Sequence, residues 1–420
     1  MQNAQQVKVT KLESRLNYLV GITLMTNLYY ISGLFSLPSI LPIIGVLTIS
    51  AFYFFKRINY SKLLFHINFW MIIGFVVFSF FLYIPELIFR GSTFNPNDIL
   101  RVLIYLFFIG WTLSIRITWE AMARYFGLSA LLALIALLIL GWVEKEFPLL
   151  FALLLPPNLV RGNLTRIGAT LIDPNTYSTA LVVYFSAFFT FYDFVFKRGK
   201  LVVITLLILP VFLLIETSGS RQGLLLFIIW FISLGINKNW KATAITFFAS
   251  ILVFFLLAII FNEPLKNYAV ENPNTSIARI LFPSQNKMSS LSDFERNASI
   301  EAGFNFIKSN FIVFGPGAFG YLESYTNSAQ SPWVTFPHNG PLFLWTQYGI
   351  LSLYFLYWVF LLSKRAIKSG TVLFFLFFLI QFLILPNSSY YFLPVYLMFC
   401  IDTRYYYQVF LKQTQLAPNV

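Results

Sequence analysis

Long apolar segments recur along the whole chain and constrain its fold more than any other feature. A membrane-spanning helix needs about 20 predominantly apolar residues, and we count about twelve such segments. Only 11% of the residues are charged, whereas soluble domains carry about a quarter. The sequence therefore predicts an all-α, polytopic membrane protein. The segments cover roughly residues 17–36, 38–55, 63–84, 100–118, 126–143, 174–195, 201–216, 223–236, 242–262, 340–362, 371–386 and 390–403.

The basic residues are distributed unevenly over the loops. If the N-terminus lies in the cytoplasm, most of the 29 Lys and Arg but only a minority of the 16 Asp and Glu face inward. The formal net charge of +13 is then a topology signal, and no nucleic-acid partner is needed to explain it. We expect a multi-pass protein in contact with membrane lipids, with both termini in the cytoplasm.

The predicted spans divide the chain into three parts. Residues 1–262 carry spans one to nine with short loops, residues 263–339 form a long extracytoplasmic loop, and residues 340–420 carry the last three spans and a cytoplasmic tail. We treat these parts as a single membrane domain. The apolar stretch Phe147–Pro156 is too short to span and is expected to lie at the interface or to re-enter.

The long loop contains a predicted amphipathic helix at about residues 292–310. Ser292 and Glu295 have the spacing of a capping box at a helix start. Apolar residues follow at helical spacing, and they are Ile300, Phe304, Ile307 and Phe311. Arg296 falls on or beside this apolar face, where a charge usually has a partner or a ligand.

Three polar segments precede helices that are expected to run from outside to inside. In the first and third, Asp173 and Asn339 are candidate N-caps, and Pro174 suits a first helical position. A helix N-terminus presents unpaired N–H groups and the positive end of the helix dipole, which together favour phosphate. The segments are Arg166-Ile167-Gly168 with Asp173-Pro174-Asn175, then Ser218-Gly219-Ser220-Arg221-Gln222-Gly223, and then Pro337-His338-Asn339-Gly340-Pro341.

Arginine and histidine side chains in and near these segments suggest a chemistry. The guanidinium groups of Arg221 and Arg166 match phosphate oxygens, and Arg279 and Arg296 could add more from the loop. If these residues converge, they form a diphosphate cradle at the lipid boundary. Near a helix N-terminus the imidazole of His338 is favoured in its neutral form and could act as a general base.

Each feature has a plainer interpretation when it is taken alone. An interfacial arginine is often a topology anchor, Ser-Gly-Ser is commonly a turn, and Asp-Pro-Asn is commonly a helix start. Gly315–Gly320 fits the spacing of a dinucleotide fingerprint but has no predicted strand before it. A single cysteine, Cys400, and the lack of an Asp-x-Asp pair predict no metal site and no cofactor.

Taken together and in order, the three segments resemble the bacterial O-antigen ligase and O-antigen polymerase superfamily. The resemblance covers about residues 160–350 and includes Arg296, the turn Phe314–Phe319, Leu342 and Gly349. It implies a GT-C-like, metal-independent glycosyltransferase of the cell inner membrane. The implied donor is a glycan on undecaprenyl diphosphate, used at the extracytoplasmic face. A chain-length regulator or a flippase would be a protein neighbour in such a pathway.

The resemblance also implies roles for particular residues. Arg221 and Arg296 would bind the diphosphate, and His338 would activate or help to place the acceptor hydroxyl. Arg279, Arg166 and Ser220 would contribute to the donor site, with Asn339, Asp173 and Asn175 in support.

Several functional readings remain open. The acceptor is a lipid-linked repeat unit in a polymerase, which we slightly prefer, and a lipid A core sugar in a ligase. The alternatives from other classes are a glycan-lipid flippase or other transporter, which the nearly uncharged span centres disfavour, and a non-catalytic assembly scaffold.

Overall fold

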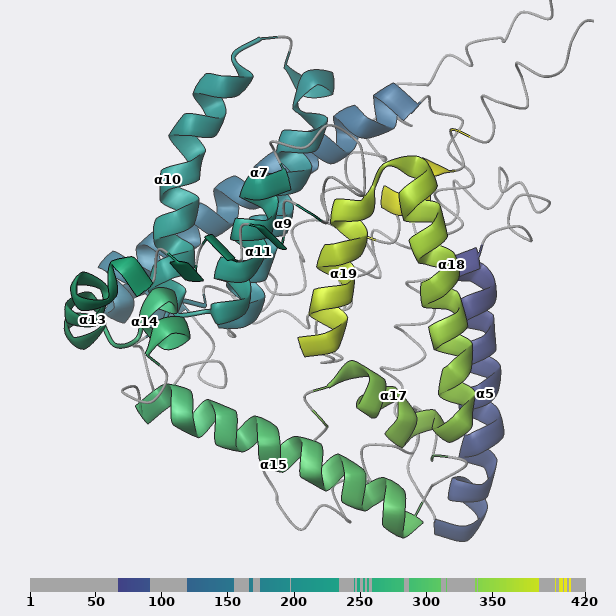
Figure 1. Cartoon of the computed structure of the whole chain (residues 1–420). Helices are drawn as coiled ribbons and strands as arrows, with labels where there is room; N and C mark the ends of the chain where they lie inside the picture. The colour runs from purple at the N-terminus through teal and green to yellow at the C-terminus, as the bar shows by residue number, and fades with distance from the viewer. Residues whose placement is uncertain are drawn as a thin grey trace, which may run out of the picture. The chain divides into compact units, whose positions relative to one another are not determined.

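A computed structural model provides the structure of the protein. It describes residues 67–90, 119–154, 166–168, 174–196, 198–233, 259–282, 287–310 and 339–384, together with residues 315 and 337 and scattered positions in 245–256 and 397–408. Every regular element among these residues is helical, which confirms the all-α prediction for this part of the chain (Figure 1).

Four helical segments of the described residues are long and apolar enough to cross a membrane. They are Phe126–Glu146, Pro174–Val195, Lys200–Ser218 and Gly340–Ser369, and all four coincide with predicted spans. Shorter apolar helices cover Ile67–Leu82, Arg221–Ile232 and Val372–Leu383, again at predicted positions. The predicted spans 17–36, 38–55 and 100–118 lie outside the described residues, so the total of about twelve stays a prediction.

The chain divides into two compact units. The first unit comprises residues 1–50 and 117–290, and the second comprises residues 51–116 and 291–420. The first contains α7 (Trp119–Glu146), α8 (Pro148–Leu154), α9 (Pro174–Val195), α10 (Lys200–Ser218), α11 (Arg221–Ser233), α13 (Asn262–Glu271) and α14 (Ser276–Leu281). The second contains α5 (Ile67–Arg90), most of α15 (Lys287–Asn310), α17 (Gly340–Tyr348), η5 (Gly349–Ser352), α18 (Leu353–Ser369) and α19 (Val372–Ile384).

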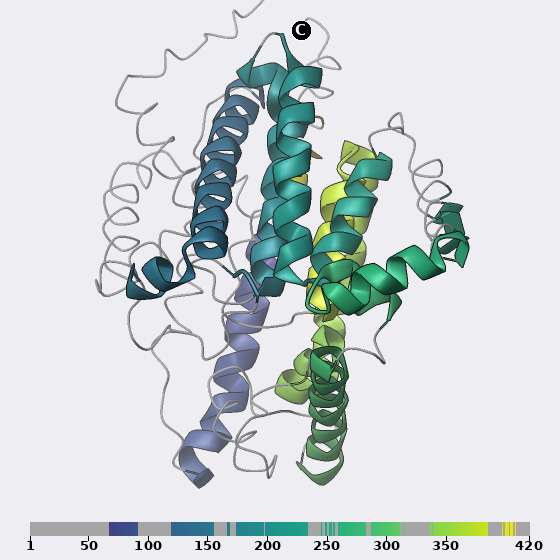
Figure 2. The same ribbon diagram turned by 90° about the vertical axis from the view of Figure 1, so that its left-hand side faces the viewer.

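Helix α9 is the central helix of the first unit. It packs against α7, α10 and α11, and most of its residues are buried (Figure 1). Pro174 is its first residue, as predicted, because proline has no N–H to lose at that position. The apolar stretch after α7 forms the seven-residue helix α8, which lies across the end of α7 in Figure 2.

Small residues let these helices approach closely. A side-chain carbon on Gly141 of α7 would overlap the hydroxyl of Tyr177 on α9, and one on Gly223 of α11 would overlap Ser178 on α9. Such contacts suit helices that associate through backbone packing, as helices do in a membrane. They fix α7 and α11 against α9 near the start of α9.

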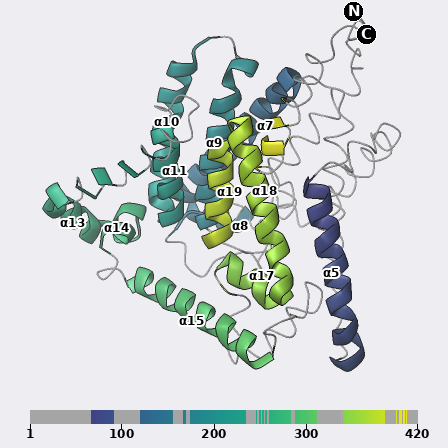
Figure 3. The ribbon, with the colours of Figure 1, turned by 45° about the vertical axis from the view of Figure 1, so that its right-hand side comes forward.

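The second unit is built on α18, which packs against α5 and α19. Helix α17 joins α18 through η5 at a bend that Figure 3 shows. Asn339 caps α17 as predicted, because its side-chain Oδ1 accepts a hydrogen bond from the backbone N–H of Leu342 at 3.0 Å.

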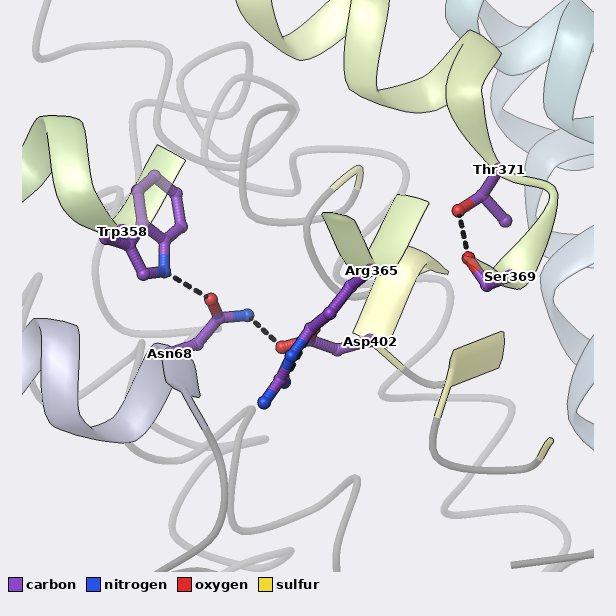
Figure 4. Close-up of polar contacts among 6 residues, drawn as sticks. All are labelled: Asn68, Trp358, Arg365, Ser369, Thr371 and Asp402. Carbon is purple, nitrogen blue, oxygen red and sulfur yellow. Dashed lines mark hydrogen bonds and ion pairs between the residues drawn. The ribbon is translucent and has the colours of Figure 1, made fainter. Parts of the chain in front are cut away.

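A buried polar network links three segments of the second unit (Figure 4). The Asn68 amide donates to one carboxylate oxygen of Asp402 at 2.6 Å, and Arg365 donates to the other at 3.2 Å. The indole N–H of Trp358 donates to the Asn68 carbonyl at 2.9 Å. Both oxygens of a fully buried carboxylate therefore have donors, and the network ties α5 and α18 to the helical residues near the C-terminus.

Helix α15 differs from its prediction in two respects. It begins at Lys287 rather than at Ser292, so the capping box does not start the helix. Its most closely packed residues are Ser299, Gly303 and Phe306, while Phe304, assigned to the apolar face, is 51% exposed. A side chain at Gly303 would press on Pro337 and Leu342 near the start of α17, so one of these side chains would have to shift.

Candidate functional site

The predicted Ser-Gly-Ser segment forms the sharp turn between α10 and α11. Gly219 has a φ of 65°, a left-handed conformation that favours glycine. A side chain on Gly219 would also overlap the carbonyl oxygen of Asn274. The Ser220 hydroxyl accepts a hydrogen bond from the backbone N–H of Gly223 at 3.1 Å, so Ser220 caps α11. The glycine is thus required by backbone geometry and by packing together.

Two arginines from distant parts of the sequence hold this turn. The guanidinium of Arg166 donates to the carbonyl oxygens of Ser218 and Gly219 at 2.9 and 3.0 Å. Arg279 on α14 also donates to the Gly219 carbonyl, and its side chain is only 3% exposed. These carbonyls are the negative end of α10, where cations are favourable. The structure therefore brings two predicted site residues to the turn that precedes Arg221.

A buried glutamate, Glu216, attaches α14 to the end of α10. Its carboxylate accepts from the backbone N–H of Ile277, in the first turn of α14, at 3.2 Å, and from the hydroxyl of Tyr268 at 3.3 Å. The hydroxyl of Ser276 donates to the Ile215 carbonyl at 2.9 Å. A carboxylate at a helix N-terminus is favourable, and this attachment is what positions Arg279.

The environment of Glu216 changes the pKa of its neighbour Tyr268. Burial raises the pKa of the Tyr268 hydroxyl, and the negative charge of Glu216 raises this pKa further. Tyr268 therefore remains a neutral donor to Glu216 above the pH at which an exposed tyrosine ionises.

A second buried glutamate holds the segment that carries Arg166. The Glu144 carboxylate, at the end of α7, accepts from the backbone N–H of Gly168 at 2.9 Å. Residues 166–168 thus lie between the end of α7 and the α10–α11 turn. The predicted Arg-x-Gly motif thus connects two helix ends. Its arginine donates to the end of α10, and the backbone N–H of its glycine donates to Glu144 at the end of α7.

Glu144 and Glu216 were not among the predicted site residues. The signal that was available is their position, because each is a carboxylate at the end of an apolar helix in a chain with few charges. Burial of such a group requires donors, and both glutamates find backbone N–H groups.

The remaining predicted residues of the first unit lie at helix starts. Arg221 is the first residue of α11 and is partly exposed. Asn175 is the second residue of α9, and its carbonyl oxygen accepts from the Ser178 hydroxyl at 3.0 Å. Ser178 is also the residue against which Gly223 packs. The candidate N-cap Asp173 lies outside the described residues.

Two predicted site residues are described in the second unit. Arg296 lies three residues before Ser299 and seven before Gly303, so it shares the packed face of α15. That face reaches the start of α17, which Asn339 caps. His338 lies outside the described residues. The convergence of Arg221, Arg296 and His338 on one pocket stays a prediction.

The arrangement in the first unit has a definite electrostatic character. Arg166, Arg221 and Arg279 supply three positive charges at or beside one turn, and the buried Glu144 and Glu216 supply two negative charges nearby. The N-terminus of α11 adds the positive end of a helix dipole. A helix N-terminus and a guanidinium therefore lie side by side at this turn, a combination that also occurs in phosphate-binding sites.

Comparison with known proteins does not assign the chain to a family. No protein-family model matches the sequence, and no curated protein is found to be similar to it.

Proposed function

We propose that this chain is a membrane glycosyltransferase of the O-antigen polymerase or ligase type. It would transfer a glycan from undecaprenyl diphosphate to an acceptor sugar hydroxyl at the extracytoplasmic face of the inner membrane. A polymerase, whose acceptor is a lipid-linked repeat unit, is slightly preferred over a ligase, whose acceptor is the lipid A core. The proposal rests on the sequence motifs and on the geometry of one of them.

The observation that carries the proposal is the α10–α11 turn. Three arginines from separate segments of the chain, Arg166, Arg221 and Arg279, lie at or beside it; Arg166 and Arg279 hold its carbonyls, and Arg221 is the first residue of α11. A departing diphosphate is an anion, and positive charge at this turn would stabilise it. Preorganised donors at a leaving group lower the barrier because they need not reorganise during the reaction.

In the proposed mechanism Arg221 and Arg296 bind the diphosphate of the donor. His338 takes the proton of the acceptor hydroxyl as its oxygen attacks the anomeric carbon, with inversion at that carbon. The bond between the anomeric carbon and the diphosphate oxygen breaks, and the diphosphate leaves with the electron pair. Arg166 and Arg279 keep the turn, and with it Arg221, in place.

Reconstitution tests the activity. The purified protein, in liposomes with a lipid-linked glycan donor and an acceptor, should form a glycosidic bond. A transporter or a scaffold would form no such bond. Arg221→Ala and His338→Ala should each slow transfer by about 100- to 1,000-fold, by analogy with the loss of an oxyanion-hole donor. The matched control is Arg198→Ala, which removes an exposed arginine between α9 and α10. Wild-type rates in the Arg221 or His338 variant would contradict the site assignment.

Polymerase and ligase differ in what accumulates without the gene. Loss of a polymerase should leave single repeat units on the surface lipid, and loss of a ligase should leave long lipid-linked polymer unattached. A gel of the surface polysaccharide from the deletion strain distinguishes the two.

The sidedness of the site has its own test. The only native cysteine, Cys400, is buried, so an introduced cysteine can be labelled against a low background. Glu271 lies between Tyr268, which contacts Glu216, and Asn274, which contacts Gly219, whereas Arg198 lies at the opposite end of α10; both positions are exposed, and the variants are Glu271→Cys and Arg198→Cys. A membrane-impermeant thiol reagent added to intact spheroplasts should label the first and spare the second. The reverse pattern would place the site in the cytoplasm.

A further inference from the structure

Gln222, in the first turn of α11, is buried without a hydrogen-bond partner. It follows Arg221, and its side chain is 5% exposed. Neither its amide nitrogen nor its amide oxygen has a hydrogen-bond partner among the described residues. Burial of an amide without hydrogen bonds is unfavourable, so such a group calls for an explanation.

The geometry of α11 directs this side chain to the candidate site. Side chains on a helix tilt toward its N-terminus, so the amide of the second residue lies along the first turn. That turn is the one capped by Ser220, and it begins with Arg221. Gly223, the next residue, packs against Ser178 of α9, so the first turn of α11 lies directly against α9. The unpartnered amide and the helix N-terminus therefore belong to one place.

The chemistry of the amide identifies the kind of ligand. A carboxamide needs an acceptor for its N–H groups and a donor for its oxygen. Phosphate oxygens offer only acceptors when ionised, so a diphosphate would satisfy half of the amide. A sugar hydroxyl or acetamido group offers a donor and an acceptor together.

We propose that Gln222 binds the sugar that is attached to the donor diphosphate, through a hydroxyl or acetamido group of that sugar. This inference rests on the proposed function. Arg221 and the α11 N-terminus would hold the diphosphate, and the amide of the next residue would select what the diphosphate carries. Gln222 would thus be a specificity-determining residue next to the charged part of the site.

Binding of two lipid probes tests the proposal. The full-length protein in lipid nanodiscs is titrated with undecaprenyl diphosphate and with undecaprenyl diphosphate N-acetylglucosamine. The wild type should bind the sugar-bearing probe more tightly. Gln222→Leu and Gln222→Met should each lose about tenfold to 100-fold in affinity for the sugar-bearing probe, which corresponds to two hydrogen bonds. Both variants should retain the wild-type affinity for the sugar-free probe.

The folded state provides an independent readout. Because both substitutions remove an unpartnered buried amide, the ligand-free variants should melt at or above the wild-type temperature. The matched control, Ser129→Ala on α7, removes a different unpartnered buried polar group, a hydroxyl, and should leave both affinities unchanged.

The outcomes separate the two proposals. An equal loss for both probes would show that Gln222 acts on the diphosphate, and an unchanged affinity for both would show that it contacts no ligand; either result overturns the inference and leaves the proposed function standing. A wild type that binds the probes equally also overturns it. A wild type that binds neither probe would contradict the proposed function itself.

Discussion

The guanidinium of Arg279 donates a hydrogen bond to the backbone carbonyl of Gly219, sixty positions earlier in the chain. This contact joins α14 to the end of α10, on the side where Arg166 contacts the same carbonyl. The conformation of the α10–α11 turn, and therefore the position of Arg221, depends on residues that are far away in the sequence. Four measurements test this and related features.

Removal of the Arg279 guanidinium should destabilise the first unit. Arg279→Met keeps the length of the side chain but loses a charged donor to a backbone carbonyl, and such hydrogen bonds contribute about 1.5–3 kcal/mol. We expect the melting temperature of the variant in detergent, measured by intrinsic tryptophan fluorescence, to be several degrees lower than that of the wild type. Arg198→Met, at an exposed arginine, is the control. Equal melting temperatures for the two variants would refute a structural role for Arg279.

Gly219 and Gly370 form a matched pair of left-handed helix ends. Their φ angles are 65° and 69°, but a side chain on Gly219 would overlap Asn274, whereas a side chain on Gly370 would have nothing within 4 Å. Gly370→Ala should cost only the conformational term, about 1–2 kcal/mol. Gly219→Ala should cost clearly more, because the turn must also move. Similar losses, measured by thermal unfolding, would mean that the turn yields easily.

The ion pair between Arg365 and Asp402 should be worth far more than the exposed pair between Lys200 and Asp193. The Asp402 side chain is 1% exposed and the Asp193 side chain is 71% exposed. Asp402→Ala leaves Arg365 without its buried partner and should cost about 3–5 kcal/mol. Asp193→Ala should cost no more than about 1 kcal/mol. Thermal unfolding of both variants measures the difference, and a mild effect at Asp402 would mean that water reaches this network.

Tyr268 should make stability depend on pH in the alkaline range. Its pKa is raised by burial and by Glu216, so the hydroxyl ionises more readily in the unfolded chain than in the folded protein. Its contribution is therefore fully present below about pH 10, the ordinary tyrosine pKa, and falls as the pH rises beyond it.

The test is the Tyr268→Phe substitution. At pH 8 the variant should be less stable than the wild type by about 1 kcal/mol, the value of one hydrogen bond. Above pH 10 this difference should shrink. Tyr357→Phe, at an exposed tyrosine of α18, is the comparison. A difference that stays constant between pH 8 and pH 11 would contradict the assigned environment of Tyr268.

Local chemistry was sufficient to predict several helix boundaries. Pro174 begins α9 because proline has no N–H to lose there, and Asn339 caps α17 because its side chain accepts from a backbone N–H three residues later. Both effects depend only on neighbouring residues. Ser292 was predicted to begin a helix for the same kind of reason, and here the prediction was wrong. Residues 287–291 contain neither glycine nor proline, so no residue before the capping box prevents helix formation. The helix α15 therefore starts earlier, at Lys287.

The sequence by itself determined where the chain is apolar, and hence that it folds as helices of membrane-spanning length, because this depends on composition summed over about 20 consecutive residues. Only the tertiary structure decided what the isolated polar residues do. Arg166 and Arg279 were predicted to hold a ligand, and the structure has both donating to the carbonyls of one turn; Glu144 and Glu216 were not selected, and they hold the segments that carry those arginines. A buried charge is stabilised by whichever partner lies within about 3 Å, and that partner is set by how helices pack, not by its distance along the chain.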